Sequence, residues 1–458
     1  NSDGANARAG THRTEELEGG SLRRLRSTLA ATAVAAAALL VGAPTVAAAP
    51  DTVDMGDVFG PFVLDTFRDG RIAPPEQWRP RHPVTDPWFQ APPVADLAPG
   101  TLLKARPATV QVYGVQPAHV RGYQLMYVTT DFDGSRVVST GILMIPEDGT
   151  APQDRKLIGY SEANDSLGPG CMPSAQWTGT DQDDPSLFSA LGPVAQMFGN
   201  GWAVMMSDTA NDGDPAPNGF SIGQFSGAAT LDGLRAAIAL PEAEFERDVP
   251  IGIYGIAGGG VAAGFAAEKQ ASYAPELDVV GTVLQAMVID SATFERKADG
   301  GIGAGFVFAN SLGYAARYPE IDLDKELTPL GKQVADLFNR TCQQTYLLMP
   351  FMPLSALYTH GRPADNPAFA RAYAENRMGQ QAPKAPVLIT SCRDDFLVPY
   401  SDVENLIAAY RAGGTDVTVE PSHCGVTDVL TDPYRVGTEM LGMQNVDWFV
   451  GKFEETTR

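Results

Sequence analysis

Basic residues are scarce in this sequence. Its 458 residues contain 33 Lys and Arg against 55 Asp and Glu, which gives a formal net charge of −22 at pH 7. A protein that binds nucleic acid or an anionic membrane needs a basic face to neutralise phosphate groups. The charge therefore argues against both partners and favours a soluble protein with a well-solvated surface.

Metal-binding residues are scarce as well. The sequence has five histidines and four cysteines, and it contains no C-x-x-C and no H-E-x-x-H motif. We therefore expect neither a metal site nor a cofactor. An even number of cysteines in an exported protein favours two disulfides, for which three pairings are possible. The four are Cys171, Cys342, Cys392 and Cys424.

A run of small apolar residues covers Leu29–Ala49 and follows the cationic stretch Ser21–Arg26. A positive region, an alanine-rich region and an A-x-A-like end are typical of a secretory signal peptide, which we predict over 1–49. The paired arginines within the cationic stretch are compatible with twin-arginine export. A membrane anchor is the alternative, because the run could span a bilayer. Pro44 and the small residues after it favour cleavage, so we expect a secreted protein without a membrane anchor after processing.

No internal repeat follows this leader. Residues 50–108 are rich in proline and short of periodic patterns, which predicts an extended N-terminal wrap over the surface. Two β-rich runs within Arg121–Asp148 flank Asp131–Ser135 and predict a hairpin.

Short apolar runs then alternate with amphipathic patterns such as 229–240 and 403–412. Continuously apolar strands between such helices are typical of a mostly parallel sheet that is covered on both faces. The sequence therefore predicts an α/β fold. The strands expected are 156–161, 202–208, 251–256, 279–285, 385–391 and 416–422.

One interval, 292–383, interrupts this alternation because it has helical patterns and no convincing strand. An insertion of this kind between two strands is most simply a helical cap over the carboxyl ends of the sheet, where ligands bind. We expect the core to comprise 109–291 before the cap and 384–458 after it.

The stretch IYGIAGGGVAAGF (253–265) lacks a serine where one would be expected. A strand, a sharp turn and a helix in the pattern G-x-S-x-G expose the nucleophile of α/β-hydrolases. Here Gly255 and Gly259 occupy the two glycine positions, and Ala257 occupies the middle one. Ser226, in GQFSG, is no substitute because it is not on a strand-to-helix turn.

A dinucleotide-binding loop is the main alternative for this stretch, since Gly258, Gly260 and Gly264 follow a strand and begin a helix. Such a loop needs an acidic residue at the end of the next strand. Asp278 instead precedes that strand, so the hydrolase interpretation is favoured.

An acid and a histidine follow the turn in the chain order that α/β-hydrolases use. Asp395 comes just after the strand 385–391, and His423 comes just after 416–422. Asp395 could instead be a turn residue that satisfies local backbone groups, and a lone histidine is often only a polar loop residue. If the two form a dyad, then Cys392 and Cys424 come close enough to be bridged. Cys171 would then pair with Cys342.

Four stretches carry a resemblance to a known family: EANDSLGPGCMPS (162–174), GWAVMMSDT (201–209), the glycine-rich turn with YAPEL after it, and DDFLVP (394–399). On these residues the chain resembles the secretory lipases typified by Candida antarctica lipase A and related bacterial exported lipases. It implies an α/β-hydrolase core with a helical cap, two disulfides and cofactor-free hydrolysis of acylglycerols or similar esters. It also implies that Asp165 and the amide of Gly258 lie at the oxyanion hole, with His423 as base and Asp395 as acid.

Ala257 departs from the family pattern, because alanine has no oxygen with which to form an acyl-enzyme. The sequence thus predicts a secreted carboxylic-ester hydrolase whose nucleophile position is held by alanine, with an ester or lipid as its small-molecule partner. The alternatives are a non-catalytic relative that binds acyl or other hydrophobic ligands, and an amide or lactone hydrolase on the same fold.

Overall fold

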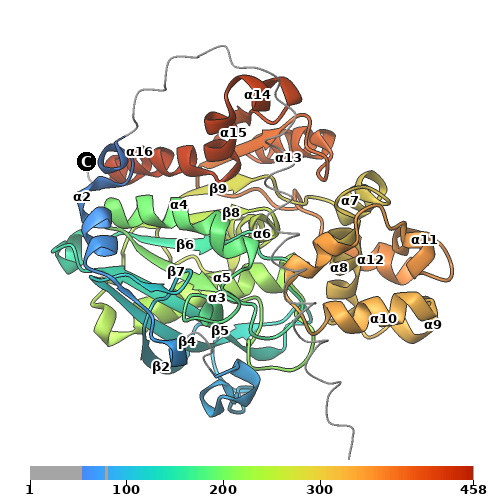
Figure 1. Ribbon diagram of the computed structural model, residues 1–458, viewed down its shortest axis with the longest axis horizontal. Helices are drawn as coiled ribbons and strands as arrows, with labels where there is room; N and C mark the ends of the chain where they lie inside the picture. Colours follow the sequence, from blue (N-terminus) through green and yellow to red (C-terminus); the bar gives the residue numbers. More distant parts are fainter. Residues whose placement is uncertain (1–53, 78–80, 457–458) are drawn as a thin grey trace, which may run out of the picture. The chain divides into compact units, whose positions relative to one another are not determined.

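A nine-stranded sheet organises the chain (Figure 1). The computed structural model describes residues 54–77 and 81–456, so the predicted signal peptide lies outside the described residues. Met55–Arg458 forms one compact unit, and of a second unit, Asn1–Asp54, only Asp54 is described. The strands of the sheet are β2 (Leu102–Ala108), β4 (Val120–Thr130), β5 (Arg136–Pro146), β6 (Leu157–Ser161), β7 (Ala203–Ser207), β8 (Ile251–Ile256), β9 (Val279–Gln285), β10 (Val387–Cys392) and β11 (Val417–Ser422).

The strand order is β11-β10-β9-β8-β6-β7-β5-β4-β2. All pairs among β6 to β11 are parallel, whereas β2, β4 and β5 add an antiparallel edge. The predicted mostly parallel sheet, its six strands and the hairpin of β4 and β5 are confirmed. Every residue of β8 is buried, as expected for a parallel strand covered on both faces.

Helices cover both faces of the sheet. Side chains alternate along β8, so the neighbours Ile253 and Tyr254 pack in two different apolar clusters between the sheet and its helices. The helices outside the insertion are α2 (Met55–Arg68), α3 (Pro173–Gln176), α4 (Pro185–Gly199), α5 (Gly223–Ala239), α6 (Gly258–Tyr273), α13 (Tyr400–Ala412), α14 (Val426–Thr431), α15 (Pro433–Met440) and α16 (Val446–Thr456).

The named elements of the segment between β9 and β10 are all helices, although Leu327 and Tyr358 form an isolated bridge. Figure 1 shows its helices gathered at one side of the sheet, and they share an apolar cluster with core residues such as Leu167 and Phe225. The elements of this helical insertion are α7 (Ser291–Ala298), α8 (Ala304–Ala315), α9 (Leu323–Glu326), α10 (Pro329–Phe338), η6 (Gln343–Leu348), α11 (Leu354–Leu357), η7 (Pro363–Asp365) and α12 (Pro367–Glu375). Its role as a cap stays a prediction.

The proline-rich segment 50–108 is more regular than expected. Helix α2 forms there with a kink at Gly60, whose φ of 79° only glycine adopts easily and which precedes Pro61. β2 joins the sheet at its edge, where Pro107 is tolerated because an edge strand leaves one row of N–H groups unpaired. Within the described ranges, no helix is long and apolar enough to cross a membrane.

Candidate active site

Strand β8 ends in a strained turn at Ala257, which has φ 51° and ψ −120°. A positive φ is uncommon for a residue other than glycine, so the surrounding structure must hold it in place. Ala257 N donates to Gln285 O at 2.9 Å, and Gly260 N donates to Ala257 O at 2.9 Å. The strand, turn and helix therefore have the geometry in which a nucleophile would be exposed.

Gly255 and Gly259 flank Ala257 at two points where another part of the backbone lies too close for a side chain to fit. A Cβ at Gly255 would collide with the backbone of Gly259 and with Ala263. A Cβ at Gly259 would collide with the carbonyl groups of Ser161 and Glu162, at the end of β6. The strand and the helix can approach one another only with glycine at both positions.

Asp165 and Gly258, the residues expected at an oxyanion hole, lie against each other. A Cβ at Gly258 would collide with the Asp165 carboxylate. Burial, assisted by the negative charge of Asp184, raises the pKa of Asp165 to about 7. The backbone N–H of Asp165 donates to Oε1 of Gln343 at 2.9 Å. That N–H is thus engaged with the helical insertion, and the carboxyl is the part of Asp165 that faces Gly258.

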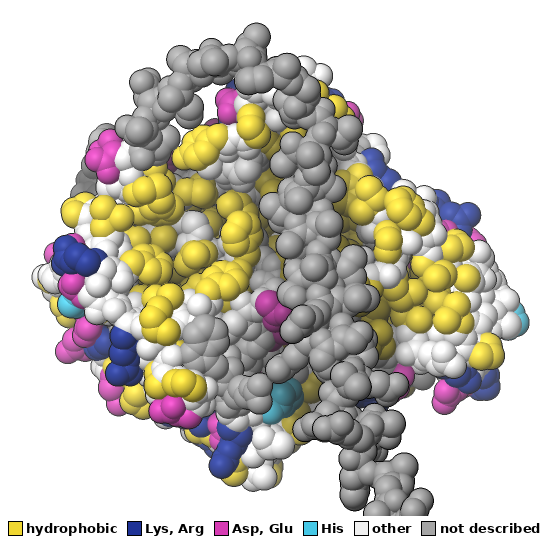
Figure 2. Space-filling model, in the orientation of Figure 1, with side chains coloured by type: hydrophobic (Ala, Val, Ile, Leu, Met, Phe, Trp, Pro, Cys, Tyr) yellow, Lys and Arg dark blue, Asp and Glu magenta, His cyan; other side chains and the backbone are white. Residues whose placement is uncertain are grey.

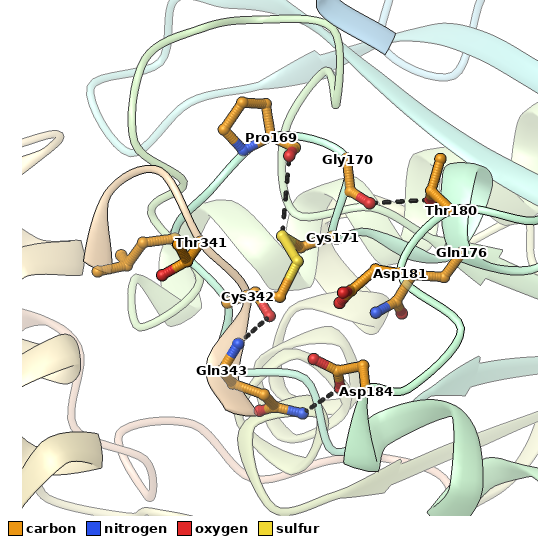
Figure 3. Close-up of a disulfide and its surroundings, with 12 residues drawn as sticks. Pro169, Gly170, Cys171, Gln176, Thr180, Asp181, Asp184, Thr341, Cys342 and Gln343 are labelled. Atoms are coloured by element: carbon orange, nitrogen blue, oxygen red, sulfur yellow. Dashed lines mark hydrogen bonds between the residues drawn. A yellow bond between two sulfur atoms is a disulfide. The ribbon is translucent and has the colours of Figure 1, made fainter. Parts of the chain in front are cut away.

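Gln343 fastens the insertion to the core (Figure 3). Its Nε2 donates to Ala163 O at 2.9 Å and to Asp184 Oδ1 at 2.8 Å, and the residue is 2% exposed. The preceding residue, Cys342, forms a disulfide with Cys171, with 5.5 Å between the Cα atoms. This pairing confirms the prediction. Its place next to Cys342 is the only feature of the sequence that points to this role of Gln343.

Within the described part of the chain, one group of side chains has the spacing of a metal site: Cys171, Asp181 and Cys342. Its two sulfur atoms are joined in the disulfide, so they are not available as thiolate ligands.

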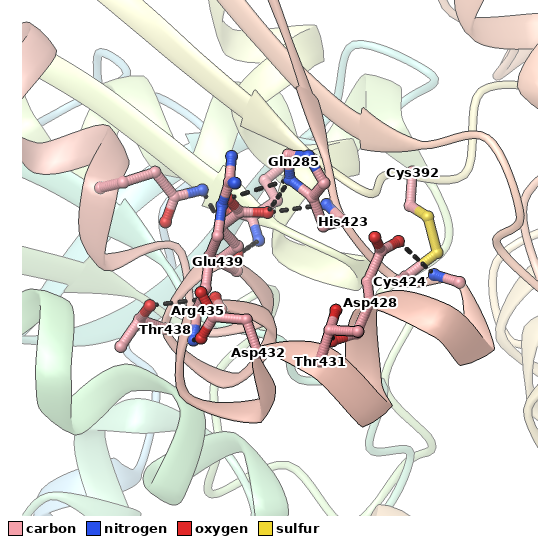
Figure 4. Close-up of polar contacts among 12 residues, drawn as sticks. Gln285, Cys392, His423, Cys424, Asp428, Thr431, Asp432, Arg435, Thr438 and Glu439 are labelled. Atoms are coloured by element: carbon pink, nitrogen blue, oxygen red, sulfur yellow. Dashed lines mark hydrogen bonds and ion pairs between the residues drawn. A yellow bond between two sulfur atoms is a disulfide. The ribbon is translucent and has the colours of Figure 1, made fainter. Parts of the chain in front are cut away.

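His423 lies directly after β11, and its ring contacts a carboxylate that the sequence did not indicate (Figure 4). Nδ1 of His423 is 3.0 Å from Oε2 and 3.2 Å from Oε1 of Glu439, and His423 N donates to Oε2 at 2.7 Å. Arg435 Nε donates to Oε1 of Glu439 at 2.7 Å from the previous turn of α15. The His423 side chain is 38% exposed, against 11% for that of Glu439.

Asp395 has a different environment from the one expected of a partner to His423. Its Oδ1 accepts hydrogen bonds from Leu397 N at 2.7 Å and Val398 N at 2.9 Å, which close the turn after β10. Among the described residues, the hydrogen bonds of the His423 ring go to Glu439 and not to Asp395, so the expected Asp395–His423 hydrogen bond is corrected here. A catalytic role for Asp395 stays a prediction.

The second predicted disulfide, Cys392–Cys424, is present with 6.0 Å between its Cα atoms. It joins the end of β10 to the residue after His423, and so ties the loops that carry Asp395 and His423.

The alternatives considered for the glycine-rich turn do not fit the structure. Asp278 lies before β9, at the opposite end of that strand from the turn, and a Cβ at Gly264 would collide with Met378. The space beside Gly264 is thus filled by the Met378 side chain. Ser226 lies inside α5 and is buried, away from any strand-to-helix turn.

The helical insertion carries much exposed apolar surface, seen as yellow atoms in Figure 2 on the side where Figure 1 places its helices. Its exposed large hydrophobic residues are Ile302, Leu330, Leu337, Leu347, Leu348 and Phe351. Contiguous apolar surface of this kind is typical of a place where a hydrophobic ligand or partner binds.

Comparison with known sequences gives a consistent set of relatives. The family model described as secretory lipase matches residues 190–425, just over half of the chain. A Mycobacterium tuberculosis protein named "Probable inactive lipase MT1628" is 28% identical over 360 residues, which cover 74% of this chain and 77% of that protein. "Secreted triacylglycerol lipase LIP4" of Malassezia globosa is 27% identical over 348 residues, with 73% and 74% covered.

Solved structures share the fold. Candida antarctica lipase A in its closed state matches with a TM-score of 0.72 and 23% identity, over 82% of this chain and 87% of that one. The rice cell wall degrading esterase LipA of Xanthomonas oryzae matches with a TM-score of 0.61 and 18% identity, over 78% and 99%. The predicted α/β-hydrolase fold is confirmed.

Proposed function

The chain belongs to the secretory lipase family, and from that premise we propose that it is a secreted carboxylic-ester hydrolase scaffold whose nucleophile position is held by Ala257. The observation that carries this proposal is the conformation of Ala257, which lies between β8 and α6 with φ 51° and ψ −120°. The methyl group of alanine has no chemistry that requires this strained conformation, whereas a serine there would present its hydroxyl at the start of a helix.

The proposed mechanism uses the residues expected around the turn. With serine at position 257, its oxygen would attack the ester carbonyl while Nε2 of His423 takes the proton. The oxyanion would meet Gly258 N–H, and the carboxyl of Asp165 next to it can donate a hydrogen bond while it is protonated. His423 would then protonate the leaving alcohol, and water would release the acid by the reverse route.

As the chain stands, no acyl-enzyme can form at Ala257. We expect at most the background rate of a triad enzyme that lacks its nucleophile, roughly 10³ to 10⁴ over the reaction in water. The name of the Mycobacterium tuberculosis relative, a probable inactive lipase, supports a second candidate: a protein that binds acyl or other hydrophobic ligands without turnover. The two disulfides and the relatives named as secreted lipases support a place outside the cell.

The test is Ala257→Ser, assayed on p-nitrophenyl esters and triacylglycerols of several chain lengths, with an anilide and a lactone alongside. We expect a gain of about 10² or more in kcat/KM on an ester. Ala257→Ser combined with His423→Asn is the control, and it should abolish the gain. A serine variant that folds normally, binds an acyl ligand and hydrolyses none of these compounds would reject the hydrolase and favour the binding protein. Hydrolysis of only the anilide or only the lactone would instead indicate an amide hydrolase or a lactone hydrolase on the same fold.

A further inference from the structure

The carboxylate of Glu439 is built into the loop that carries His423. It accepts hydrogen bonds from His423 N, from the His423 ring and from Arg435, so both of its oxygens are used. Burial raises the pKa of Glu439, but these hydrogen bonds outweigh burial and hold the pKa below its usual range. Glu439 is therefore a charged acceptor at neutral pH.

The main chain of Glu439 is fixed to the same strand end as the turn at Ala257. Gln285, the last residue of β9, donates from Nε2 to Glu439 O at 2.7 Å. The backbone carbonyl of Gln285 accepts from Ala257 N at 2.9 Å. Asn445 Nδ2 donates to Gln285 Oε1 at 2.6 Å, which holds the amide of Gln285 in this orientation. One buried glutamine thus links Ala257 to Glu439 through hydrogen bonds.

We propose that Glu439 is the positioning residue for His423, in the place where the sequence led us to expect Asp395. Its carboxylate accepts the Nδ1 proton of His423, fixes the ring orientation and leaves Nε2 free to exchange a proton with the reacting groups. Asp395, whose Oδ1 closes a turn, shapes the neighbouring loop. The inference rests on the proposed function for its catalytic meaning, although the contact itself can be tested without catalysis.

The first experiment uses the chain with Ala257 in place, so that activity is not needed. A hydrogen-bonded Nδ1 proton of His423 should give a deshielded proton NMR signal, assigned by its loss in His423→Asn. We expect Glu439→Gln to shift or remove the signal and Glu420→Gln, an exposed acid on β11, to leave it unchanged. A signal that survives Glu439→Gln and disappears in Asp395→Asn would overturn the inference.

The second experiment uses the Ala257→Ser background. We expect Glu439→Gln to lower kcat by 10² or more with KM within about threefold, because a carboxylate at Nδ1 acts on the transition state rather than on binding. Glu439→Asp should recover part of the loss, Glu420→Gln should have no effect, and thermal unfolding should check that each variant is folded. A folded Glu439→Gln variant with unchanged kcat would overturn the inference. If the Ala257→Ser variant shows no hydrolysis, the proposed function fails. The NMR signal of the Nδ1 proton then still decides whether Glu439 positions His423.

Discussion

The turn at Ala257 and the loop at His423 are held in place by different means. Around Ala257 the constraint is main chain against main chain, since Gly255 and Gly259 leave no room for a Cβ. Around His423 the constraint is a set of side-chain contacts with Glu439 and a disulfide at Cys424. Losing one side chain at position 257 therefore leaves the turn assembled, whereas losing one carboxylate at position 439 would release the histidine.

A substitution at Gly259 tests the backbone packing around Ala257, and we expect it to cost the most stability. Gly259→Ala would place a Cβ against the carbonyl groups of Ser161 and Glu162, which cannot move without disturbing β6. We expect a loss of about 3 kcal/mol or more in the free energy of unfolding. Gly437→Ala, in α15 near His423, is the matched control because a Cβ there meets nothing within 4 Å. It should stabilise by up to about 1 kcal/mol through helix propensity. Equal effects in urea unfolding would remove the distinction between the two regions.

The two disulfides give the next comparison. The sequence separation is 171 residues for Cys171–Cys342 and 32 for Cys392–Cys424. Replacing either pair by serine should cost roughly 2–5 kcal/mol, and the longer loop should cost about 1.5 kcal/mol more by chain entropy. Urea unfolding of the two double-serine variants measures which disulfide contributes more to stability. A larger loss for Cys392–Cys424 would show that the histidine loop depends on its disulfide more than chain entropy requires.

A weaker test uses pH, because the pKa values of Asp165 and Glu439, one carboxyl from each region, are shifted in opposite directions. The pKa of Asp165 is raised to about 7, so the folded state keeps a proton that the unfolded chain releases near pH 4. The stability that Asp165 contributes is complete below about pH 4 and is lost as pH rises through 7. The pKa of Glu439 is lowered, so its contribution is present above about pH 4.3 and is lost as pH falls through its folded value.

Urea unfolding between about pH 3 and pH 8 checks both signs. From about pH 5 to pH 8, the free energy of unfolding should fall by about 1–3 kcal/mol, and Asp165→Asn should flatten this slope. Glu439→Gln should differ most from the parent above about pH 5 and converge with it toward pH 3. A slope from pH 5 to pH 8 that Asp165→Asn leaves unchanged would contradict the assignment for Asp165.

The part of the site that backbone packing holds in place, around Ala257, could be predicted from the sequence. Fully buried parallel strands leave continuous apolar runs such as 251–256, and the crowded turn leaves glycines at 255 and 259. Both are local consequences of burial and backbone geometry. The pairing of Cys392 with Cys424 could be predicted from the expected closeness of Asp395 and His423, and the structure places both cysteines at the carboxyl ends of the neighbouring strands β10 and β11.

The contact between His423 and Glu439 could not be predicted in this way. Glu439 lies on α15, and the place of this helix is set by Gln285 from a distant strand. Its sequence signal is that of an ordinary helix acid paired with Arg435 four residues earlier. For Asp395, the alternative interpretation as a turn residue describes the hydrogen bonds that the structure contains.

The disulfide connectivity also bears on how the chain is made. Cysteines leave the ribosome in the order 171, 342, 392 and 424, and the bonds join the first to the second and the third to the fourth. If the cysteines also reach an oxidising compartment in this order, the first bond that they can form with one another is a native one, and so is the next if pairs close as they appear. A chain that oxidises in order of appearance has no wrong bridge to undo, and so needs no disulfide exchange before its strands assemble.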